Sequence, residues 1–346
     1  MFNVALIAPS SADERRRIAA VDLRVRVHDA WELFAPELVA DWPRQTLDWY
    51  LPPRFRQLAS SATERDALLA EADAICITFP FPTRLLARAP RVRFIHQLPA
   101  GVSNLQRGDL WQAQVPITSG RGAGNTLAIA EWAIAATLAL FKELPKAARQ
   151  AGQMDRRAYR ARQVAGKTLG VVGLGGIGQQ VARLASGLGL RVVGSRRSAE
   201  QPVEHVERVY PPSQLPDLLG ESDVVVLATQ LTAETHHLID AAALRAMRQG
   251  AFLLNVARGE LIDEPALIQA LQSGHLGGFA SDVYVGEFEH QPPAELTAFE
   301  NVLLTPHTSG MTDQASNAAR ALFRENLRRC LHGEPLLNQV DWSRGY

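Results

Sequence analysis

The chain of 346 residues is poor in cysteine and has no excess of charge of either sign. Its two cysteines, Cys76 and Cys330, exclude a disulfide framework and a site of clustered thiolates, so we expect no metal centre. The 36 basic residues are balanced by 36 acidic ones. Nucleic-acid binding usually needs a basic excess against the phosphates, and it is therefore not expected here.

Long apolar runs and targeting segments are also lacking. The longest apolar stretch, residues 126–141, is shorter than the roughly 20 residues of a membrane span, and it contains Glu131. Its Ala and Leu content predicts a buried or interface helix instead. The opening run MFNVALIAPSS has no charged segment before it and predicts a first strand rather than a signal peptide. We therefore expect a soluble, cytoplasmic protein that does not bind membranes.

Short β-type runs alternate with helical patterns along the whole chain. This alternation is typical of an α/β protein, in which helices cover both faces of a parallel sheet. Taking about 150 residues per domain, the length indicates two domains. The strands predicted from the pattern lie at 4–8, 74–78 and 92–96, and then at 168–173, 190–195, 223–229, 251–257, 276–284 and 301–306.

The helical pattern at 312–331 would pack back on the first domain, which makes that domain discontinuous. We expect one domain over 1–104 and 310–346, with a hinge near Pro99–Gly101, and an inserted nucleotide-binding domain over 105–309. Both are expected to have Rossmann-like or flavodoxin-like parallel sheets.

A glycine-rich segment, Gly173-Leu-Gly-Gly-Ile-Gly178, directly follows an apolar strand and opens a helical pattern. The first glycine permits a tight turn, the second lets the backbone approach a pyrophosphate, and the third allows close packing of helix on strand. The helix N-terminus then presents free N–H groups to the anion. The segment therefore predicts dinucleotide binding, with contacts from Gly173, Gly175, Gly176, Ile177 and Gly178.

The strand after this helix ends in Ser195-Arg196-Arg197. An NAD enzyme usually carries Asp or Glu at this place, about 20 residues past the glycines, for the ribose 2′-hydroxyl. Two guanidiniums and a hydroxyl would instead bind a 2′-phosphate. The sequence favours NADP (NADPH) as the cofactor, and NAD stays open.

Three titratable residues follow apolar strands, at the edge where ligands bind in open α/β sheets. Arg258 follows the run at 251–257, Glu287 follows the run that contains Asp282, and His307 follows the run at 301–306. Arginine binds a carboxylate with two hydrogen bonds, histidine exchanges protons near neutral pH, and a carboxylate stabilises protonated imidazole. The three types together predict acid–base chemistry on a carboxylate-bearing substrate.

The segments GKTLGVVGLGGIGQQVA, LLNVARGELIDEPALIQAL, SDVYVGE and LTPHTSG, together with NTLAIAEWA, resemble the D-isomer-specific 2-hydroxyacid dehydrogenases. This family includes glyoxylate/hydroxypyruvate reductases and phosphoglycerate dehydrogenases. The resemblance implies that Arg258, Glu287 and His307 are catalytic and that Asp282 holds the nicotinamide carboxamide. It also implies NAD(P)H-dependent reduction of a small 2-keto acid to a D-2-hydroxy acid. Further cofactor contacts are expected from Thr229, Ala257 and Ser309, and substrate contacts from Arg258, Phe81 and Gly101.

The resemblance also implies a homodimer, because Met154 and Tyr159 lie in a region similar to the dimer arm of the family. A residue from this arm could reach the active site of the partner chain. His96, which follows a strand, could line the cleft or be a structural histidine.

Several positions depart from the common pattern of the family. Gln230 and Phe288 stand where prolines are usual, and Ser103 stands where many members carry Asp. The loop Phe79–Pro82 contains prolines, which cannot donate the backbone hydrogen bonds that often hold a carboxylate. These departures bear on the substrate rather than on the chemistry. The alternatives that the resemblance allows are a non-catalytic nucleotide sensor or corepressor, or a phosphite dehydrogenase on the same scaffold. Formate oxidation fits less well, because that branch has an amide where Glu287 stands.

Overall fold

The computed structural model describes residues 1–123, 125–150, 152, 155–311 and 316–345. The chain forms two units, one of residues 1–124 with 314–346 and the other of residues 125–313. The first boundary lies further along the chain than the expected 104/105, because the strand at Ile117–Ser119 pairs with Phe94–Gln97 in the first unit. The second boundary lies at 313/314 rather than 309/310.

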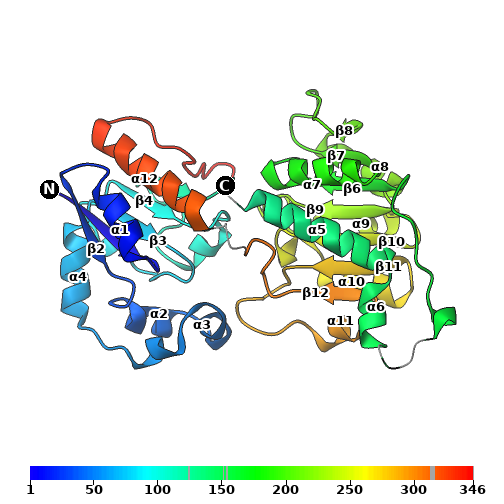
Figure 1. Ribbon diagram of the computed structural model, residues 1–346, viewed down its shortest axis with the longest axis horizontal. Coiled ribbons are helices and arrows are strands. Elements are labelled where there is room, and N and C mark those ends of the chain that lie inside the picture. The colour runs from blue at the N-terminus through cyan, green and yellow to red at the C-terminus, as the bar shows by residue number, and fades with distance from the viewer. Residues whose placement is uncertain (124, 151, 153–154, 312–315, 346) are drawn as a thin grey trace. The chain divides into compact units, whose positions relative to one another are not determined.

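The first unit has a parallel sheet of five strands in the order β2-β1-β3-β4-β5 (Figure 1). Helices α1 and α12 cover one face, where Ile18, Phe323 and Leu327 pack on Val4 of the first strand. Helices α2, α3 and α4 cover the other face. The bounds are β1 (Phe2–Ile7), α1 (Ala12–Ala19), β2 (Val25–Asp29), α2 (Ala35–Asp41), α3 (Arg44–Tyr50), α4 (Ala62–Glu71), β3 (Ala74–Ile77), β4 (Phe94–Gln97), β5 (Ile117–Ser119) and α12 (Ser316–His332).

The second unit has a parallel sheet of seven strands in the order β12-β11-β10-β9-β6-β7-β8. Helices α5 and α7 contribute to the core on one face, and α8, α9, α10 and α11 to the core on the other. The bounds are α5 (Thr126–Phe141), α6 (Leu144–Arg149), β6 (Thr168–Val172), α7 (Gly176–Gly187), β7 (Arg191–Ser195), β8 (Arg208–Tyr210), α8 (Leu215–Glu221), β9 (Val224–Leu227), α9 (Ala241–Ala246), β10 (Ala251–Asn255), α10 (Glu264–Gln272), β11 (Leu276–Ser281), α11 (Ala294–Ala298) and β12 (Val302–Leu304).

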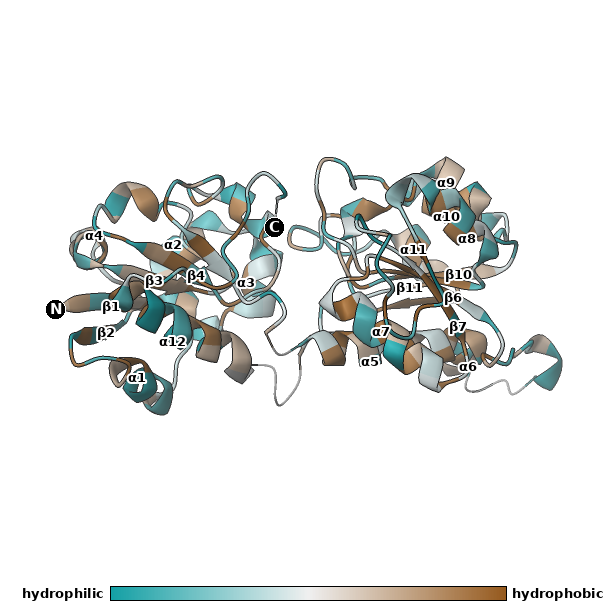
Figure 2. Ribbon diagram, turned by 90° about the horizontal axis from the view of Figure 1, so that it is seen from above, coloured by the Kyte–Doolittle hydropathy of each residue, from teal (hydrophilic) through white to brown (hydrophobic). Residues whose placement is uncertain are grey.

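The strands of the second sheet run outward from β6, with β7 on one side and β9 on the other. The connection from β7 and β8 to β9 therefore crosses back over β6, and a reversal of strand order of this kind creates a ligand-binding crevice at the carboxyl ends of the strands. In Figure 2, brown hydrophobic colour is concentrated on the strands of each sheet, and much of the teal lies on helices. This is the pattern of sheets that are buried on both faces.

The predicted α/β class with parallel sheets is confirmed, as are all nine predicted strands. Helix α10 begins after Asp263, whose side chain accepts a hydrogen bond from the Ala266 N–H at 3.3 Å. Helix α9 ends at Ala246, and Gly250, with a φ of +75°, lies in the turn that leads into β10. Among the described residues, no helix is long and apolar enough to cross a membrane.

Candidate active site

The glycine-rich loop between β6 and α7 has the geometry of a nucleotide-binding turn. Gly173 has a φ of +102°, and a Cβ there would lie 2.8 Å from the backbone of Ala228. A Cβ on Gly178 would lie 2.1 Å from the Gly173 carbonyl oxygen, whereas one on Gly175 would meet no atom within 4 Å. Two glycines thus permit close packing, and Gly175 leaves open space at the N-terminus of α7. That space and the free N–H groups of the helix fit a pyrophosphate.

Ser195, Arg196 and Arg197 lie at the carboxyl end of β7, the strand next to β6. Ser195 is buried, and its carbonyl oxygen accepts hydrogen bonds from the first two residues of the glycine loop, Gly173 and Leu174, at 3.1 Å each. The Arg196 guanidinium binds two carbonyl oxygens of its own loop at 2.7 and 2.8 Å. These contacts fix the Arg196 guanidinium against the loop that follows β7.

Arg197 is half exposed and forms an ion pair of 3.2 Å with Glu234, in the loop after β9. Thr229, at the start of that loop, has its backbone nitrogen 2.8 Å from the point where a Cβ of Gly173 would lie. The loops after β6, β7 and β9 therefore meet around the glycine segment, as the sequence predicts for a dinucleotide site.

Glu287 and His307 lie together at the carboxyl ends of β11 and β12. The Nδ1 of His307 is 3.0 Å from the Oε1 of Glu287, whose side chain is buried. Because an ionised carboxylate only accepts hydrogen bonds, this contact places the ring proton on Nδ1 and leaves Nε2 as the nitrogen that can exchange a proton. The ring of Phe288, at one of the departures from the family pattern, lies 6.0 Å from the imidazole.

Asp282 is buried at the end of β11 and binds the loop that carries His307. Its Oδ1 accepts hydrogen bonds from the Thr305 hydroxyl and from the Thr308 N–H, the latter at 2.8 Å. Its Oδ2 accepts one from the Ser309 N–H at 2.8 Å, and its carbonyl oxygen accepts one from the His307 N–H at 2.8 Å. The resemblance implies that Asp282 holds the nicotinamide carboxamide and that Ser309 contacts the cofactor, and in the structure these two residues are hydrogen-bonded to each other.

The backbone of His307 has a φ of +54°, in the left-handed region that residues other than glycine rarely adopt. Such a conformation costs free energy and persists where surrounding contacts fix it. The hydrogen bonds to Asp282 on both sides of His307 supply these contacts. Asp282 therefore acts, in this structure, on the orientation of the histidine.

Arg258 lies just after β10, the strand next to β11. Its carbonyl oxygen accepts a hydrogen bond from the Asn255 side chain at 2.7 Å, and its Nη1 donates to the Ala257 carbonyl oxygen at 2.6 Å. The next residue, Gly259, has no room for a side chain, because a Cβ there would lie 2.2 Å from the carbonyl carbon of Tyr284. This close approach packs the Arg258 loop against the loop that leads to Glu287.

The structure thus places the predicted arginine, carboxylate and histidine at the carboxyl ends of three adjacent strands, β10, β11 and β12. Within the described part of the chain, no cluster of three or more His, Cys, Asp or Glu side chains could hold a metal ion.

In the first unit, the structure corrects the expectation for Phe81. Its side chain is fully buried in the core and packs on Trp42, whose Nε1 donates to the Phe81 carbonyl oxygen at 2.6 Å. A side chain in that position cannot contact a substrate. Phe79, two residues earlier, is half-buried and packs its ring against Trp42 and Tyr50.

Two other predicted residues of the first unit can be placed. The carbonyl oxygen of Gly101 accepts a hydrogen bond from the buried Gln97 side chain at 2.7 Å, which fixes the loop after β4. His96 is fully buried and its Nδ1 lies 2.8 Å from the Thr118 hydroxyl, so it is a structural histidine. In the second unit, Tyr159 is half-buried with its ring 5.6 Å from Lys146 Nζ, whereas Met154 lies outside the described residues.

A nucleotide-binding glycine loop and a buried carboxylate paired with a histidine define an oxidoreductase that uses a nicotinamide cofactor. Residues 134–309 match the NAD-binding domain of the D-isomer specific 2-hydroxyacid dehydrogenases. The chain is also 32% identical to a glyoxylate reductase of Aeropyrum pernix over 337 residues, which cover 92% of this chain and 96% of that protein. The chain therefore belongs to the D-isomer specific 2-hydroxyacid dehydrogenase family and is an NAD(P)-dependent oxidoreductase.

Two further comparisons show the extent of the similarity. A D-isomer specific 2-hydroxyacid dehydrogenase from Xanthobacter autotrophicus, solved in complex with NADPH and MES, is 28% identical, with a TM-score of 0.76 over 100% of this chain and 99% of that one. The D-3-phosphoglycerate dehydrogenase of Methanocaldococcus jannaschii is 29% identical over 82% of this chain, which spans 55% of the length of that relative.

Proposed function

We propose that this protein reduces a small 2-keto acid to the D-2-hydroxy acid, with His307 as the acid, Glu287 as its partner and Arg258 as the carboxylate-binding residue. The observation that carries the proposal is the 3.0 Å contact between the partly exposed imidazole and the buried carboxylate. A reduced nicotinamide, when bound, supplies a hydride to the C2 carbon of the substrate.

The protein's own residues supply the binding group and the proton in this proposal. Arg258 binds the carboxylate of the keto acid through its planar guanidinium and polarises the ketone. His307 gives the proton on Nε2 to the developing alkoxide, and Glu287 stabilises the protonated ring before the transfer. In the reverse direction the neutral ring takes the proton from the hydroxy acid.

We further propose that NADPH is the preferred cofactor. Arg196 and Arg197 follow β7, at the position where an NAD enzyme usually carries a carboxylate. Their guanidiniums would attract a 2′-phosphate, and the neutral Ser195 would not repel it. The similar protein from Xanthobacter autotrophicus was solved with NADPH. The homodimer and the cytoplasmic location implied above stay predictions.

The test is a spectrophotometric assay of NADPH oxidation with glyoxylate, hydroxypyruvate, phenylpyruvate and branched 2-keto acids. We expect turnover with at least one of them, and His307→Ala should reduce kcat by about 10² to 10⁴, the contribution of a positioned general acid. The same variant should still bind NADPH, as measured by fluorescence.

Activity on none of these acids would contradict the proposal, and so would near-full activity of His307→Ala. NADPH binding without turnover would favour the nucleotide sensor, whereas NADP reduction with phosphite would favour the phosphite dehydrogenase.

A further inference from the structure

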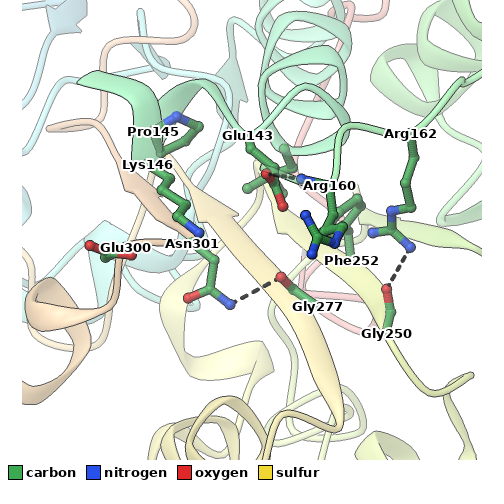
Figure 3. A pocket seen from close by; sticks show the side chains of 11 residues that line it. Glu143, Pro145, Lys146, Arg160, Arg162, Gly250, Phe252, Gly277, Glu300 and Asn301 are labelled. Atoms are coloured by element: carbon green, nitrogen blue, oxygen red, sulfur yellow. Dashed lines mark hydrogen bonds between the residues drawn. The ribbon is translucent and has the colours of Figure 1, made fainter. Parts of the chain in front are cut away.

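A cavity of about 530 Å³ lies in the second unit, at the end of the sheet opposite to the candidate catalytic residues. Figure 3 shows the side chains that line it. Gly250, Gly277 and Asn301 line it where β10, β11 and β12 begin. Arg258, Glu287 and His307 follow the carboxyl ends of the same three strands. The cavity is therefore separate from the site described above.

Three cations line this cavity, Lys146, Arg160 and Arg162, all from the segment that follows α5. Their side-chain nitrogens donate hydrogen bonds to main-chain carbonyl oxygens at 2.6 to 3.0 Å. These contacts orient the cations without neutralising them, because a carbonyl carries no net charge.

Two carboxylates also line the cavity, and both have other partners. Glu143 accepts a hydrogen bond from the backbone N–H of Arg160 at 2.6 Å, and Glu300 accepts one from the Gln150 side chain at 2.8 Å. The lining thus has three cations against two carboxylates, and its formal charge is positive.

Arg162 is the most firmly placed of the three cations. Its guanidinium lies 4.1 Å from the ring centre of Phe252 and 5.1 Å from that of Phe141, and it donates to the Gly250 carbonyl oxygen at 3.0 Å. Its burial lowers the pKa of the guanidinium, since burial disfavours the charged form. A bound anion would offset this cost and would find a donor group already in place.

We propose that this cavity binds a small multivalent anion, a metabolite that carries carboxylate or phosphate groups on a compact body. The volume is in the range of small-molecule sites, about 300–1,000 Å³. Phe252 and Leu140 provide apolar surface for the body of the ligand, and Lys146, Arg160 and Arg162 provide the donors for its charged groups.

The experiment is isothermal titration calorimetry on the NADPH-saturated protein, so that the cofactor already fills the glycine loop. Pyrophosphate and citrate are the probes, and they separate phosphate from carboxylate recognition. We expect at least one to bind, and the double variant Lys146→Gln/Arg160→Gln to weaken its affinity about tenfold or more, as the loss of charge-assisted hydrogen bonds requires. Arg162 is left unchanged because its stacking on Phe252 also contributes to packing.

Two single variants serve as controls. Arg183→Gln removes an exposed cation from α7, outside the cavity, and should leave anion affinity unchanged. Arg258→Gln removes the cation of the candidate active site and should also leave it unchanged. Absence of binding by both probes would overturn the proposal. Loss of binding in Arg258→Gln, or unaltered binding in the double variant, would overturn it equally.

Discussion

The imidazole of His307 and the carboxylate of Glu287 lie 3.0 Å apart but differ greatly in exposure, with 29% of the histidine side chain accessible and 4% of the glutamate side chain. The carboxylate is therefore shielded from water, and the ring that it orients reaches the surface of the second unit. A buried negative charge interacts strongly with a proton on its neighbour, because little solvent screens the pair.

The variant Glu287→Gln tests this pairing. The amide can still orient the ring but carries no charge, so the protonated imidazole loses stabilisation. We expect the alkaline limb of the kcat/KM profile for keto-acid reduction to move to lower pH, because the acid form of His307 is then lost earlier. The control is Glu289→Gln, an exposed carboxylate in the same loop. An unchanged profile in Glu287→Gln, or the same shift in the control, would show that Glu287 is not the partner.

Asp282 is expected to be a positioning residue for His307. In Asp282→Asn one acceptor oxygen becomes an amide that faces a backbone N–H, and two charge-assisted hydrogen bonds are weakened. Each is worth about 1.5–3 kcal/mol. We therefore expect Asp282→Asn to lower the free energy of unfolding by about 1.5–3 kcal/mol for each hydrogen bond that is lost. It should also lower kcat and change NADPH affinity little.

The comparison variant is Asp240→Ala, which removes the N-cap of α9 with its 2.8 Å contact to the Ala243 N–H. It should lower stability without lowering kcat, as measured by urea unfolding and by the keto-acid assay. A large loss of NADPH affinity in Asp282→Asn would instead support the nicotinamide contact that the sequence predicts for this residue.

The positions of Glu287 and His307 could be predicted from the sequence, because each follows an apolar strand and parallel strands end at one edge of a sheet. The partners of Asp282 could not. Two of them are backbone N–H groups, those of Thr308 and Ser309 in the loop after the next strand, and backbone donors have no sequence signature. The sequence also does not show which of the two aromatic residues in the Phe79–Pro82 loop is buried. Both rings pack on Trp42, but only Phe81 is fully buried, and no local pattern in the sequence marks this difference.

Three strands, β2, β5 and β8, were not predicted. β2 contains charged and polar residues and lies at the edge of its sheet, while β5 and β8 have three residues each and also lie at edges. β5 is buried, but a strand of three residues is too short to give a recognisable hydrophobic run, and β2 is only partly buried. Their existence depends on pairing with a neighbouring strand that is distant in sequence.

His96 gives the first unit a dependence of stability on pH. Burial lowers the pKa of this histidine to about 4, from an ordinary value of 6.5. Between these two values the unfolded chain binds a proton and the folded one does not, so stability falls as the pH drops from 6.5 to 4. At about 1.4 kcal/mol for each pH unit, the full effect is roughly 3 kcal/mol.

The variant His96→Gln should therefore flatten the free energy of unfolding between pH 6.5 and 4, as measured with urea, although packing against Phe323 will be weakened at every pH. His332→Gln, which changes an exposed histidine at the end of α12 in the same unit, should keep the wild-type slope. Equal slopes in wild type and His96→Gln would refute the assignment.

The ion pair between Arg197 and Glu234 is expected to set the strength of the NADPH preference. Both side chains are more than half exposed and lie 3.2 Å apart, and an exposed pair of this kind is worth at most about 1 kcal/mol. A 2′-phosphate, with nearly two negative charges, would therefore displace Glu234 from Arg197, and the glutamate would then repel it.

Glu234→Gln should raise NADPH affinity a fewfold, and Arg197→Ala should lower it about tenfold, the value of a charge-assisted contact. NADH affinity should change little in either variant, because its ribose hydroxyl carries no charge. Fluorescence titrations with both cofactors measure this, with Glu204→Gln, an exposed carboxylate beyond β7, as the control. Equal changes for NADPH and NADH would show that Arg197 does not contact the 2′-phosphate.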